Sequence, residues 1–535
     1  MPEAVERLSA LHVVGSGPSG IAERRTGWLG WIRRVRPELL LVVVALVLRV
    51  ARLDRSISGD ELSSLFIASR DWGSLLQSLI REDAHPPLYF LLLKGCLWLG
   101  TSEWIVRSIS VVSGVLVCWL VYRVVLVCED RRLAMASGLL VAVAPQAVWA
   151  SQCARGYTLA ACGMLVAVWC AMHLVQGRRQ WRYLVGYALG SAVALYTFYY
   201  AVLVLVALNL SALWMLRHSG RSVVRWLLLQ LAVVTLYAPW VPAYLAQTAR
   251  ISEHFEVASR LGLWWGGVHW GGIAKIVPGL FGFDPVFAAD VPWSQMRLTP
   301  WWMAAGAMVV SALMYLVLWG GIRRLRQMDE PQARWIGMWL MLGLFPAVAS
   351  VVLHHVRGVY LASYYMFLSF LFLSPVMVAV VLSCRRGIRI VAGVAVMVMC
   401  IVRLPVVYAT AEDWKGALAY AREEAGSTDA LALVRHVPGL LETYARWPHR
   451  SLVFTDYLES DARELAFTER VTEGDARLSE TLAAHPRVWV LRRQSSVYHL
   501  HEYALHWLAE HGYVLERQRD FARVRLSLFV RRYGE

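Results

Sequence analysis

Charged residues are scarce in this chain of 535 residues, where Asp, Glu, Lys and Arg together make up 17%. An average soluble domain has about 25%. Hydrophobic residues make up 58% of the chain. They occur in blocks of about 20, which is the helix length that crosses the apolar core of a bilayer. The sequence therefore predicts an α-helical polytopic membrane protein and excludes an ordinary soluble one.

Motifs that would indicate a disulfide framework, a zinc site or a nucleotide site are also missing. The eight Cys residues form no CxxC pair and no Cys/His cluster, and none of them follows residue 407. The segment after residue 407 has no P-loop and no GxGxxG sequence. Internal repeats are absent, although they are a frequent mark of transporter folds.

The net charge of +15 is not gathered in a basic stripe on a soluble segment, so we expect no nucleic-acid partner. Basic residues instead flank the hydrophobic blocks, as they do in the cytoplasmic loops of membrane proteins. Residues 1–37 are Arg-rich but hold no early apolar core with a small-residue cleavage site. We therefore expect them to form a cytoplasmic N-terminal tail. The protein itself is expected in the inner (plasma) membrane of the cell.

Six Arg-rich clusters determine the predicted topology, because basic loops stay on the cytoplasmic side. The clusters lie at residues 33–36, 129–132, 178–182, 217–225, 323–326 and 385–389. The hydrophobic blocks between them are 38–54, 108–127, 133–150, 157–176, 183–198, 199–216, 226–245, 301–322, 335–353, 365–383 and 389–407. The prediction is thus about eleven transmembrane helices, with the N-terminus inside and the C-terminus outside.

The same topology divides the chain into three parts: the tail 1–37, a transmembrane domain 38–407 and a C-terminal domain 408–535. The transmembrane domain has outer loops at 55–107 and 246–300. Within the first loop we predict two short amphipathic helices, which are followed at 88–99 by an interfacial or re-entrant helix. Candidate strands alternate with helices after residue 407, so the third part is predicted to be an extracytoplasmic α/β domain.

The first outer loop holds the densest polar cluster on the outer side. Asp60 and Glu61 form one acidic pair, and a second group contains Asp83 and His85. Carboxylates and an imidazole beside membrane helices suit general-base chemistry or cation binding. Asp60 and Glu61 also stand where acidic residues cap a helix N-terminus, so a purely structural role is the alternative.

Four segments between residues 48 and 157 carry a resemblance to a known family. They are residues 48–53 with the Gly59-Asp60-Glu61 sequence, residues 83–89, residues 99–108 and residues 151–157. Their order and spacing resemble the GT-C glycosyltransferases. The chain is most similar to the branch of the protein O-mannosyltransferases and the lipid A aminoarabinose transferases (glycosyltransferase family 39).

The resemblance implies an inverting transfer of a sugar from a polyprenyl-phosphate donor to a hydroxyl of a lipid, glycan or protein acceptor. In that family the Asp of the pair acts as general base, which implies this role for Asp60, with Glu61 in support. Asp83 and His85 would line the same site. A divalent cation is a further possibility of the family, and Asp60, Asp83 and His85 are then its candidate ligands.

Arginines are the candidates for stabilising the negative charge that develops on the leaving phosphate. Arg155 lies beside Tyr157 at the outer end of a span and matches the Arg-x-Tyr segment of the family. Arg357 lies in a short outer loop, and Arg49 lies inside a hydrophobic block, where ionisable groups are costly. Alternatively, the side chains of Arg155 and Arg49 simply extend to the membrane surface and have no role in catalysis.

The chain departs from the family at residues 149–155, where several relatives carry a second acidic residue and this chain has none. Two other functions remain open at the sequence level. A transporter or flippase of a lipid-linked or anionic substrate would need ionisable groups at mid-membrane. A membrane-anchored assembly protein would use Asp60 and Glu61 only as helix caps.

Overall fold

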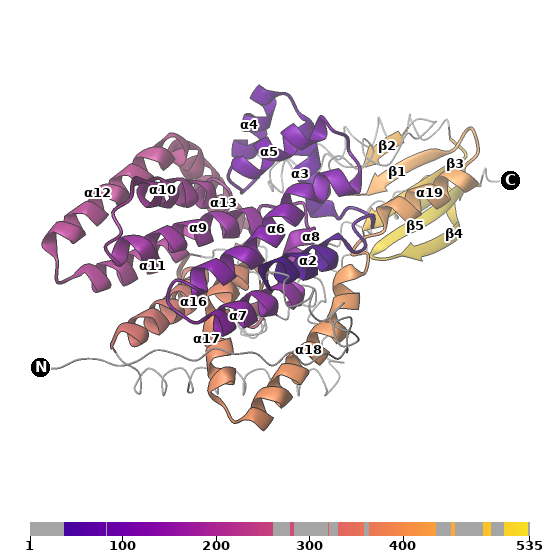
Figure 1. The fold of residues 1–535 in the computed structure, drawn as a ribbon. Helices are drawn as coiled ribbons and strands as arrows, with labels where there is room; N and C mark the ends of the chain where they lie inside the picture. Colours follow the sequence, from indigo (N-terminus) through magenta and orange to yellow (C-terminus); the bar gives the residue numbers. More distant parts are fainter. Residues whose placement is uncertain are drawn as a thin grey trace, which may run out of the picture.

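The computed structural model describes residues 37–81, 83–260, 279–282, 319, 330–357, 363–434, 451–454, 485–493, 505 and 508–532. A bundle of helices makes up most of it, and a β-sheet lies at one end of that bundle (Figure 1). The expected span at 301–322, except for residue 319, and the outer loop from residue 261 onward, except for 279–282, lie outside the described residues.

The first outer loop contains the three helices that the sequence predicts. They are α3 (Gly59–Ser69), α4 (Trp72–Arg81) and α5 (Leu88–Leu97). α5 has 10 residues, which is about half the length of a membrane crossing. It follows Pro86 and Pro87, and proline is tolerated at the start of a helix because the first N–H groups have no partner there.

Most helices of the bundle follow the predicted hydrophobic blocks, but α13 (Val241–Arg260) continues into the segment predicted as the second outer loop. The helices of the bundle are α2 (Pro37–Val50), α6 (Glu103–Val125), α7 (Arg131–Val143), α8 (Pro145–Gln152), α9 (Tyr157–Val175), α10 (Trp181–Leu195), α11 (Ala201–Leu216), α12 (Gly220–Tyr237), η1 (Ala238–Trp240), α13 (Val241–Arg260), α16 (Glu330–Arg357), η4 (Ser363–Met366), α17 (Phe367–Ser383) and α18 (Arg386–Tyr408). By length and hydropathy, 5 of the described helices could each cross a membrane, or 6 if a bent pair counts as one span. The number eleven therefore stays a prediction.

The span predicted at 133–150 is bent in the structure, because α7 and α8 meet there at an angle of 58°, as in a broken span or a re-entrant loop. Pro145 begins α8 and has no N–H to continue the hydrogen bonding of α7. The next N–H, that of Gln146, donates to the carbonyl of Gly282 at 3.0 Å instead. The break therefore leaves carbonyl groups at the end of α7 that need other donors.

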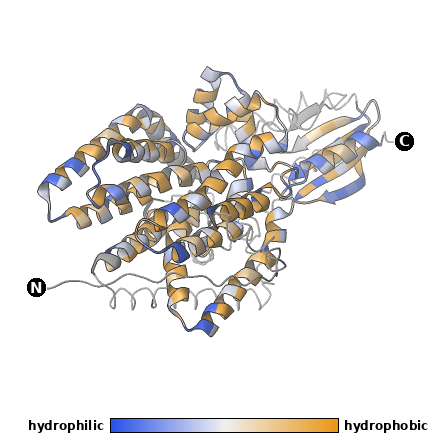
Figure 2. Ribbon diagram, in the orientation of Figure 1, coloured by the Kyte–Doolittle hydropathy of each residue, from blue (hydrophilic) through white to orange (hydrophobic). Residues whose placement is uncertain are grey.

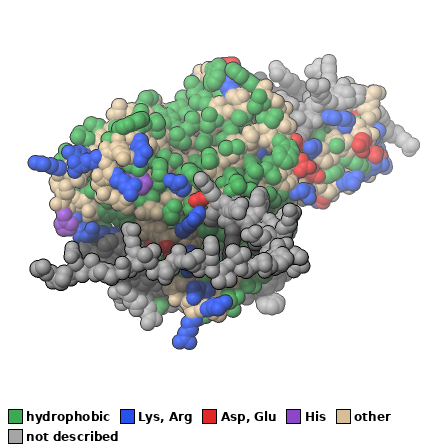
Figure 3. All heavy atoms as spheres, viewed as in Figure 1, with side chains coloured by type: hydrophobic (Ala, Val, Ile, Leu, Met, Phe, Trp, Pro, Cys, Tyr) green, Lys and Arg blue, Asp and Glu red, His purple; other side chains and the backbone are tan. Residues whose placement is uncertain are grey.

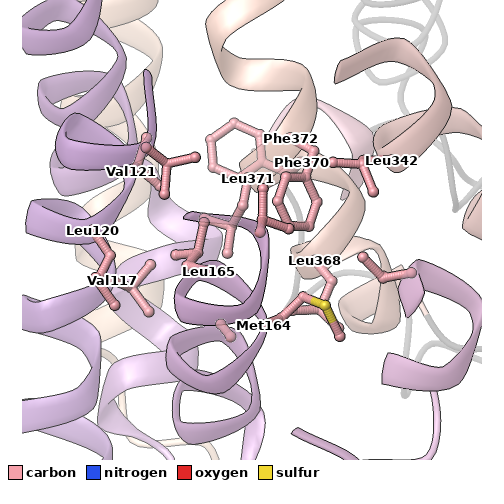
Figure 4. Packing of buried hydrophobic residues seen from close by; sticks show 14 of the residues in the cluster. Val117, Leu120, Val121, Met164, Leu165, Leu342, Leu368, Phe370, Leu371 and Phe372 are labelled. Carbon is pink, nitrogen blue, oxygen red and sulfur yellow. The ribbon is translucent and has the colours of Figure 1, made fainter. Parts of the chain in front are cut away.

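The interior of the bundle is packed by apolar side chains from α6, α9, α16 and α17 (Figure 4). Val121, Leu165, Leu342 and Phe370 are each 2% exposed or less. Lipid tails are as apolar as these side chains, so the bundle is held by close van der Waals packing rather than by exclusion of water. Hydrophobic residues predominate along the helices of the bundle (Figure 2), and some of them face outward: on α18 Val391 and Val402 are 69% and 64% exposed. Such a surface suits contact with lipid.

The contact between α9 and α10 depends on two glycines. A Cβ atom on Gly163 would lie 2.7 Å from the carbonyl oxygen of Gly190, and a Cβ on Gly190 would lie 2.7 Å from the oxygen of Gly163. Small residues at facing positions let two membrane helices approach closely. This contact keeps α10 against α9.

The C-terminal segment forms a mixed five-stranded sheet with the order β2-β1-β3-β5-β4. The strands are β1 (Ala430–Val434), β2 (Ser451–Phe454), β3 (Arg487–Arg493), β4 (Tyr513–Phe521) and β5 (Val524–Arg531). β1 pairs in parallel with β2 and β3, whereas β5 pairs antiparallel with β3 and β4. Each strand coincides with a predicted one.

One face of this sheet is covered by α19 (Trp414–Glu424). Trp414 of α19 and Trp489 of β3 belong to one buried cluster with Leu62 and Leu65 of α3. The sheet, α19 and the first outer loop thus share a continuous core. This core brings the C-terminal segment next to Asp60.

We expect Gly163→Ala to destabilise the protein, because its new methyl group would force α9 away from α10. The cost of such overpacking is about 1–3 kcal/mol. Thermal unfolding of the detergent-purified protein would measure it. Gly337→Ala in α16 is the matched control, since no atom lies within 4 Å of its added Cβ. Equal melting temperatures for the two variants would contradict the close α9–α10 contact.

Candidate active site

Asp60 and Glu61 are neighbours in the first turn of α3, but their side chains lie in different surroundings. The Asp60 side chain is 72% exposed and that of Glu61 is 3% exposed. The Ser58 backbone N–H and hydroxyl group both donate to Glu61 Oε2, at 2.9 and 3.0 Å. The predicted alternative of a helix-capping role therefore applies to Glu61, whereas the Asp60 carboxylate is exposed.

Glu61 forms a buried ion pair with Arg107 of α6. Nε and Nη2 of Arg107 donate to its two carboxylate oxygens, both at 2.8 Å. The backbone N–H of Ala154 donates to the same carboxylate at 2.9 Å. Burial by itself raises the pKa of Glu61, but the charge and hydrogen bonds of Arg107 outweigh it and lower that pKa. Glu61 is thus held ionised with several donors, which is the state of a positioning residue.

Arg107 uses its other N–H groups on the backbone that precedes α3. Nη1 donates to the carbonyls of Leu53 and Arg55 at 2.7 and 2.9 Å, and Nη2 donates to that of Ser56 at 3.1 Å. One guanidinium therefore fixes the chain before α3 and, through Glu61, the connection between α8 and α9.

A cavity of about 340 Å³ lies beside Asp60. It is formed by the start of α3, the α8–α9 connection, the end of α18 and the C-terminal sheet. Its lining residues are Arg55, Ser56, Ser58, Asp60, Glu61, Trp149, Cys153, Arg155, Tyr157, Val406, Val407, Ala409, Thr410, Ala411, Glu412, Arg493, Ala522 and Arg523. The lining combines an exposed carboxylate with four guanidinium groups, as a site for an anionic substrate would.

Arg155 and Tyr157, which the sequence analysis predicts as site residues, both line this cavity. Arg155 Nη2 lies 3.9 Å from Asp60 Oδ1, and its side chain is 13% exposed. Its neighbour Ala154 is held by Glu61, and its own carbonyl accepts from Ser110 at 3.1 Å. The backbone on both sides of the Arg155 side chain is therefore fixed next to Asp60. Tyr157 stacks on Trp149, with ring centroids 5.8 Å apart.

Arg55 also lines the cavity, and the sequence interpretation overlooked it. Its Nη1 donates to Gln152 Oε1 at 2.7 Å and to the Val407 carbonyl at 3.1 Å. Gln152 in turn donates to the carbonyls of Arg49 and Ala51 at 3.0 and 2.7 Å. The signal for Arg55 in the sequence was its position directly after a hydrophobic block, but that position is equally typical of a loop residue.

Arg49 does not line this cavity. It is fully buried, and its guanidinium donates to the carbonyls of Ala142 and Val141 at 3.1 and 3.5 Å and to Ser151 Oγ at 3.0 Å. The two carbonyls are the ones that lose their usual donors at Pro145. Arg49 therefore stabilises the break between α7 and α8, and this explains a buried arginine inside a hydrophobic helix.

Asp83 and His85 lie outside the lining of the cavity as well. Asp83 Oδ1 lies 2.6 Å from His85 Nδ1 and accepts the backbone N–H groups of Ala84 and His85 at 2.7 and 2.8 Å. Burial raises the pKa of Asp83, but His85, Arg155 and the Ala84 N–H together lower it. Arg155 thus acts electrostatically on both Asp60 and Asp83.

The predicted metal ligands do not form a donor set. Within the described ranges, no group of three His, Cys, Asp or Glu residues lies close enough to hold a metal ion. Asp60 pairs with Arg155, and Asp83 is bound by His85. These residues therefore do not fit a divalent cation in the arrangement described. α16 ends at Arg357, whose side chain lies outside the described part of the structure.

The C-terminal segment contributes Glu412, which the sequence interpretation did not single out. Glu412 is 2% exposed. Its Oε2 accepts the N–H of Gly59 and the indole N–H of Trp414, both at 2.8 Å, and its Oε1 pairs with Arg493 of β3. Because Gly59 begins α3, Glu412 joins the helix that bears Asp60 to the sheet.

We expect Glu61→Gln to lower the free energy of unfolding by about 3 kcal/mol or more at neutral pH, because it leaves Arg107 buried without a charge partner. The pKa of Glu61 is lowered in the folded protein, so its stabilisation is complete above the unfolded pKa. The difference in the free energy of unfolding between wild type and variant should shrink as the pH falls below about 4.5, toward the lowered pKa of Glu61 in the folded protein. Denaturant unfolding at a series of pH values measures this. Glu516→Gln, on an exposed strand, is the control, and a pH-independent difference would contradict the ion pair.

Comparisons with known proteins find one matching family and several solved structures of similar fold. The sequence profile of the family described as dolichyl-phosphate-mannose-protein mannosyltransferase matches residues 84–242. No curated protein matches the chain by sequence. Among solved structures, apo ArnT from Cupriavidus metallidurans is similar, with 16% identity and a TM-score of 0.52 over 94% of this chain and 98% of that chain.

Two further structures are similar over most of their length. The Archaeoglobus fulgidus oligosaccharyltransferase in complex with Zn and sulfate has 13% identity and a TM-score of 0.50, over 89% of this chain and 71% of that one. ArnT from Cupriavidus metallidurans bound to undecaprenyl phosphate has 17% identity and a TM-score of 0.46, over 94% and 98%. Identities this low establish the fold alone, and the family match covers residues 84–242. The chain therefore has the fold of ArnT, and its residues 84–242 match the dolichyl-phosphate-mannose-protein mannosyltransferase family.

Proposed function

We propose that the cavity beside Asp60 transfers a sugar from a polyprenyl-phosphate-linked donor to an acceptor hydroxyl, with inversion at the anomeric carbon. The observation that carries the proposal is the pairing of one exposed carboxylate, Asp60, with guanidinium groups on the walls of the same cavity. A hydroxyl acceptor needs a proton acceptor, and a phosphate leaving group needs cations. Asp60 supplies the first, and Arg55 and Arg155 supply the second.

The bonds change in one displacement. The acceptor hydroxyl gives its proton to the Asp60 carboxylate while its oxygen bonds to the anomeric carbon. The bond between that carbon and the phosphate oxygen breaks, and its electron pair leaves on the phosphate. Arg155 lies within 3.9 Å of Asp60, so base and cation can act on the two sides of one reacting carbon. Positioned cations stabilise the negative charge that develops on the leaving phosphate in the transition state.

A lipid-linked donor is supported by the surroundings of the cavity. The end of α18 contributes Val406 and Val407 to its lining, which places apolar surface next to the charged groups. ArnT, whose fold this chain shares, has also been seen with undecaprenyl phosphate. Lipid, glycan and protein acceptors all offer a hydroxyl.

The predicted orientation also agrees with the course of the helices. α6 and α9 begin near the cavity and end beside the basic clusters at 129–132 and 178–182. Basic loops remain cytoplasmic, so the cavity and the C-terminal sheet would face away from the cytoplasm. The inner membrane, with the N-terminus inside, remains our proposal for the location.

We expect Asp60→Asn to reduce sugar transfer by about 10²–10⁴-fold, because the amide cannot accept the proton. The assay incubates purified protein with a panel of polyprenyl-phosphate sugars and membrane extracts and detects products by mass spectrometry. Asp54→Asn is the control, since Asp54 is exposed nearby and does not line the cavity. Near-normal transfer by Asp60→Asn would refute the base. Substrate uptake without any glycosylated product would favour a transporter.

We expect Glu412→Gln to lower kcat more than it changes the melting temperature. The variant keeps the shape of the side chain but weakens the contacts with the Gly59 N–H and Arg493, so the start of α3 loses part of its support. Misplacing a catalytic group by about 1 Å costs on the order of 100-fold in rate. Glu423→Gln, which removes an exposed carboxylate from α19, the helix that follows Glu412, should leave kcat unchanged. Equal kcat values for both variants would contradict a positioning role for Glu412.

A further inference from the structure

A second cavity, of about 480 Å³, lies at the other end of α9 from the first cavity. α9 joins them, with Tyr157 at the first cavity and His173 at the second. At 1.5 Å per residue these two positions are about 24 Å apart, which approaches the thickness of the bilayer core. The second cavity therefore lies at the membrane face opposite to the candidate active site.

Among the described residues, the lining of this basic cavity holds three arginines and a histidine and no carboxylate. The residues are Arg123, Leu126, Val127, Trp169, His173, Arg178, Arg182 and Tyr183. In the part of the chain that the structure describes, none of the three arginines forms an ion pair with Asp or Glu. Lys and Arg side chains gather on the visible surface over this end of α9 to α12 (Figure 3).

The guanidinium groups of the basic cavity are held by aromatic rings rather than by acids. Arg123 lies over the Trp169 ring at 5.9 Å, and Arg182 lies over Tyr183 at 5.0 Å and donates to its hydroxyl at 3.2 Å. Stacking fixes a guanidinium through its face and leaves its N–H edge directed outward. The rings therefore orient the positive groups without neutralising them.

The turn after α9 adds the third arginine. Gly177 has a φ of 83°, a left-handed conformation that ends helices and favours glycine. The turn returns the chain over the helix end, where the N–H of Arg178 donates to the carbonyl of His173 at 3.0 Å. His173 is 6% exposed, and its Nδ1 has no hydrogen-bond partner within the described ranges. The cavity thus has a buried polar atom as well as its charges.

We propose that this basic cavity binds the phosphate of an anionic phospholipid from the leaflet opposite to the candidate active site. Arginine edges match phosphate oxygens in geometry and charge. Leu126 and Val127 add apolar surface beside them, which suits the start of an acyl chain. Basic pockets between membrane helices are known to take lipid head groups of this kind. The tendency of basic loops to stay on the cytoplasmic side explains positive charge at this face of the membrane. It does not explain why three arginines line one cavity whose described lining has no acidic residue.

The test uses the full-length protein, purified and delipidated in detergent. Native mass spectrometry measures binding of phosphatidylglycerol and of phosphatidylcholine with the same acyl chains. We expect saturable binding of phosphatidylglycerol that is weakened about tenfold in Arg178→Gln/Arg182→Gln. Both side chains are exposed, so the double variant should fold, and its melting temperature checks this.

Arg221→Gln/Arg225→Gln removes the same charge from exposed positions outside the cavity and should bind phosphatidylglycerol as wild type does. Equal weakening by both double variants would overturn the proposal, because surface charge alone would then attract the lipid. Equal binding of phosphatidylcholine would overturn it as well. Displacement of the lipid by millimolar inorganic phosphate would show that the cavity takes a soluble phosphate and would overturn the lipid assignment. Arg178→Gln alone provides a second variant, and its unchanged binding would count against the proposal.

Discussion

The ion pair between Glu61 and Arg107 is the interaction on which the candidate active site depends. It lies in the first outer loop with both side chains almost fully buried. Arg107 fixes the backbone before α3, and Glu61 fixes the start of α3 and the N–H of Ala154. Buried pairs often add little net stability over apolar residues of the same size, but losing one partner is costly. The pair thus serves mainly to set positions, and those of Asp60 and Arg155 follow from it.

A second constraint comes from the broken helix at Pro145. The missing N–H of a proline leaves carbonyl groups without donors, and in an apolar surrounding these must be satisfied. Arg49 supplies the donors from α2. The break lets α8 carry Trp149 to the cavity wall, and Gln152, also on α8, binds Arg55. An arginine that resembles a catalytic group in the sequence is therefore part of the scaffold that shapes the cavity.

The C-terminal sheet takes part in the site instead of only following the membrane helices. Glu412 contacts the first residue of α3, and Arg493 and Arg523 line the cavity. α19 and the sheet share a buried core with α3. Substrate selection can thus be shared between the first outer loop, which carries Asp60, and a segment that begins after the last membrane helix.

The sequence by itself determined the membrane class, the helices of the first outer loop and the places of the five strands, and it predicted Asp60, Arg155 and Tyr157 as site residues. These follow from hydrophobic periodicity and from residue types that lie close together along the chain. Only the tertiary structure decided that Asp60 faces the cavity while Glu61 is buried, that Arg49 supports a helix break, and that Asp83 and His85 lie outside the cavity lining. It also brought Glu412 to Gly59 across 353 residues of sequence. Local patterns fix which face of a helix is apolar, but contacts between distant segments depend on the packing of the whole chain.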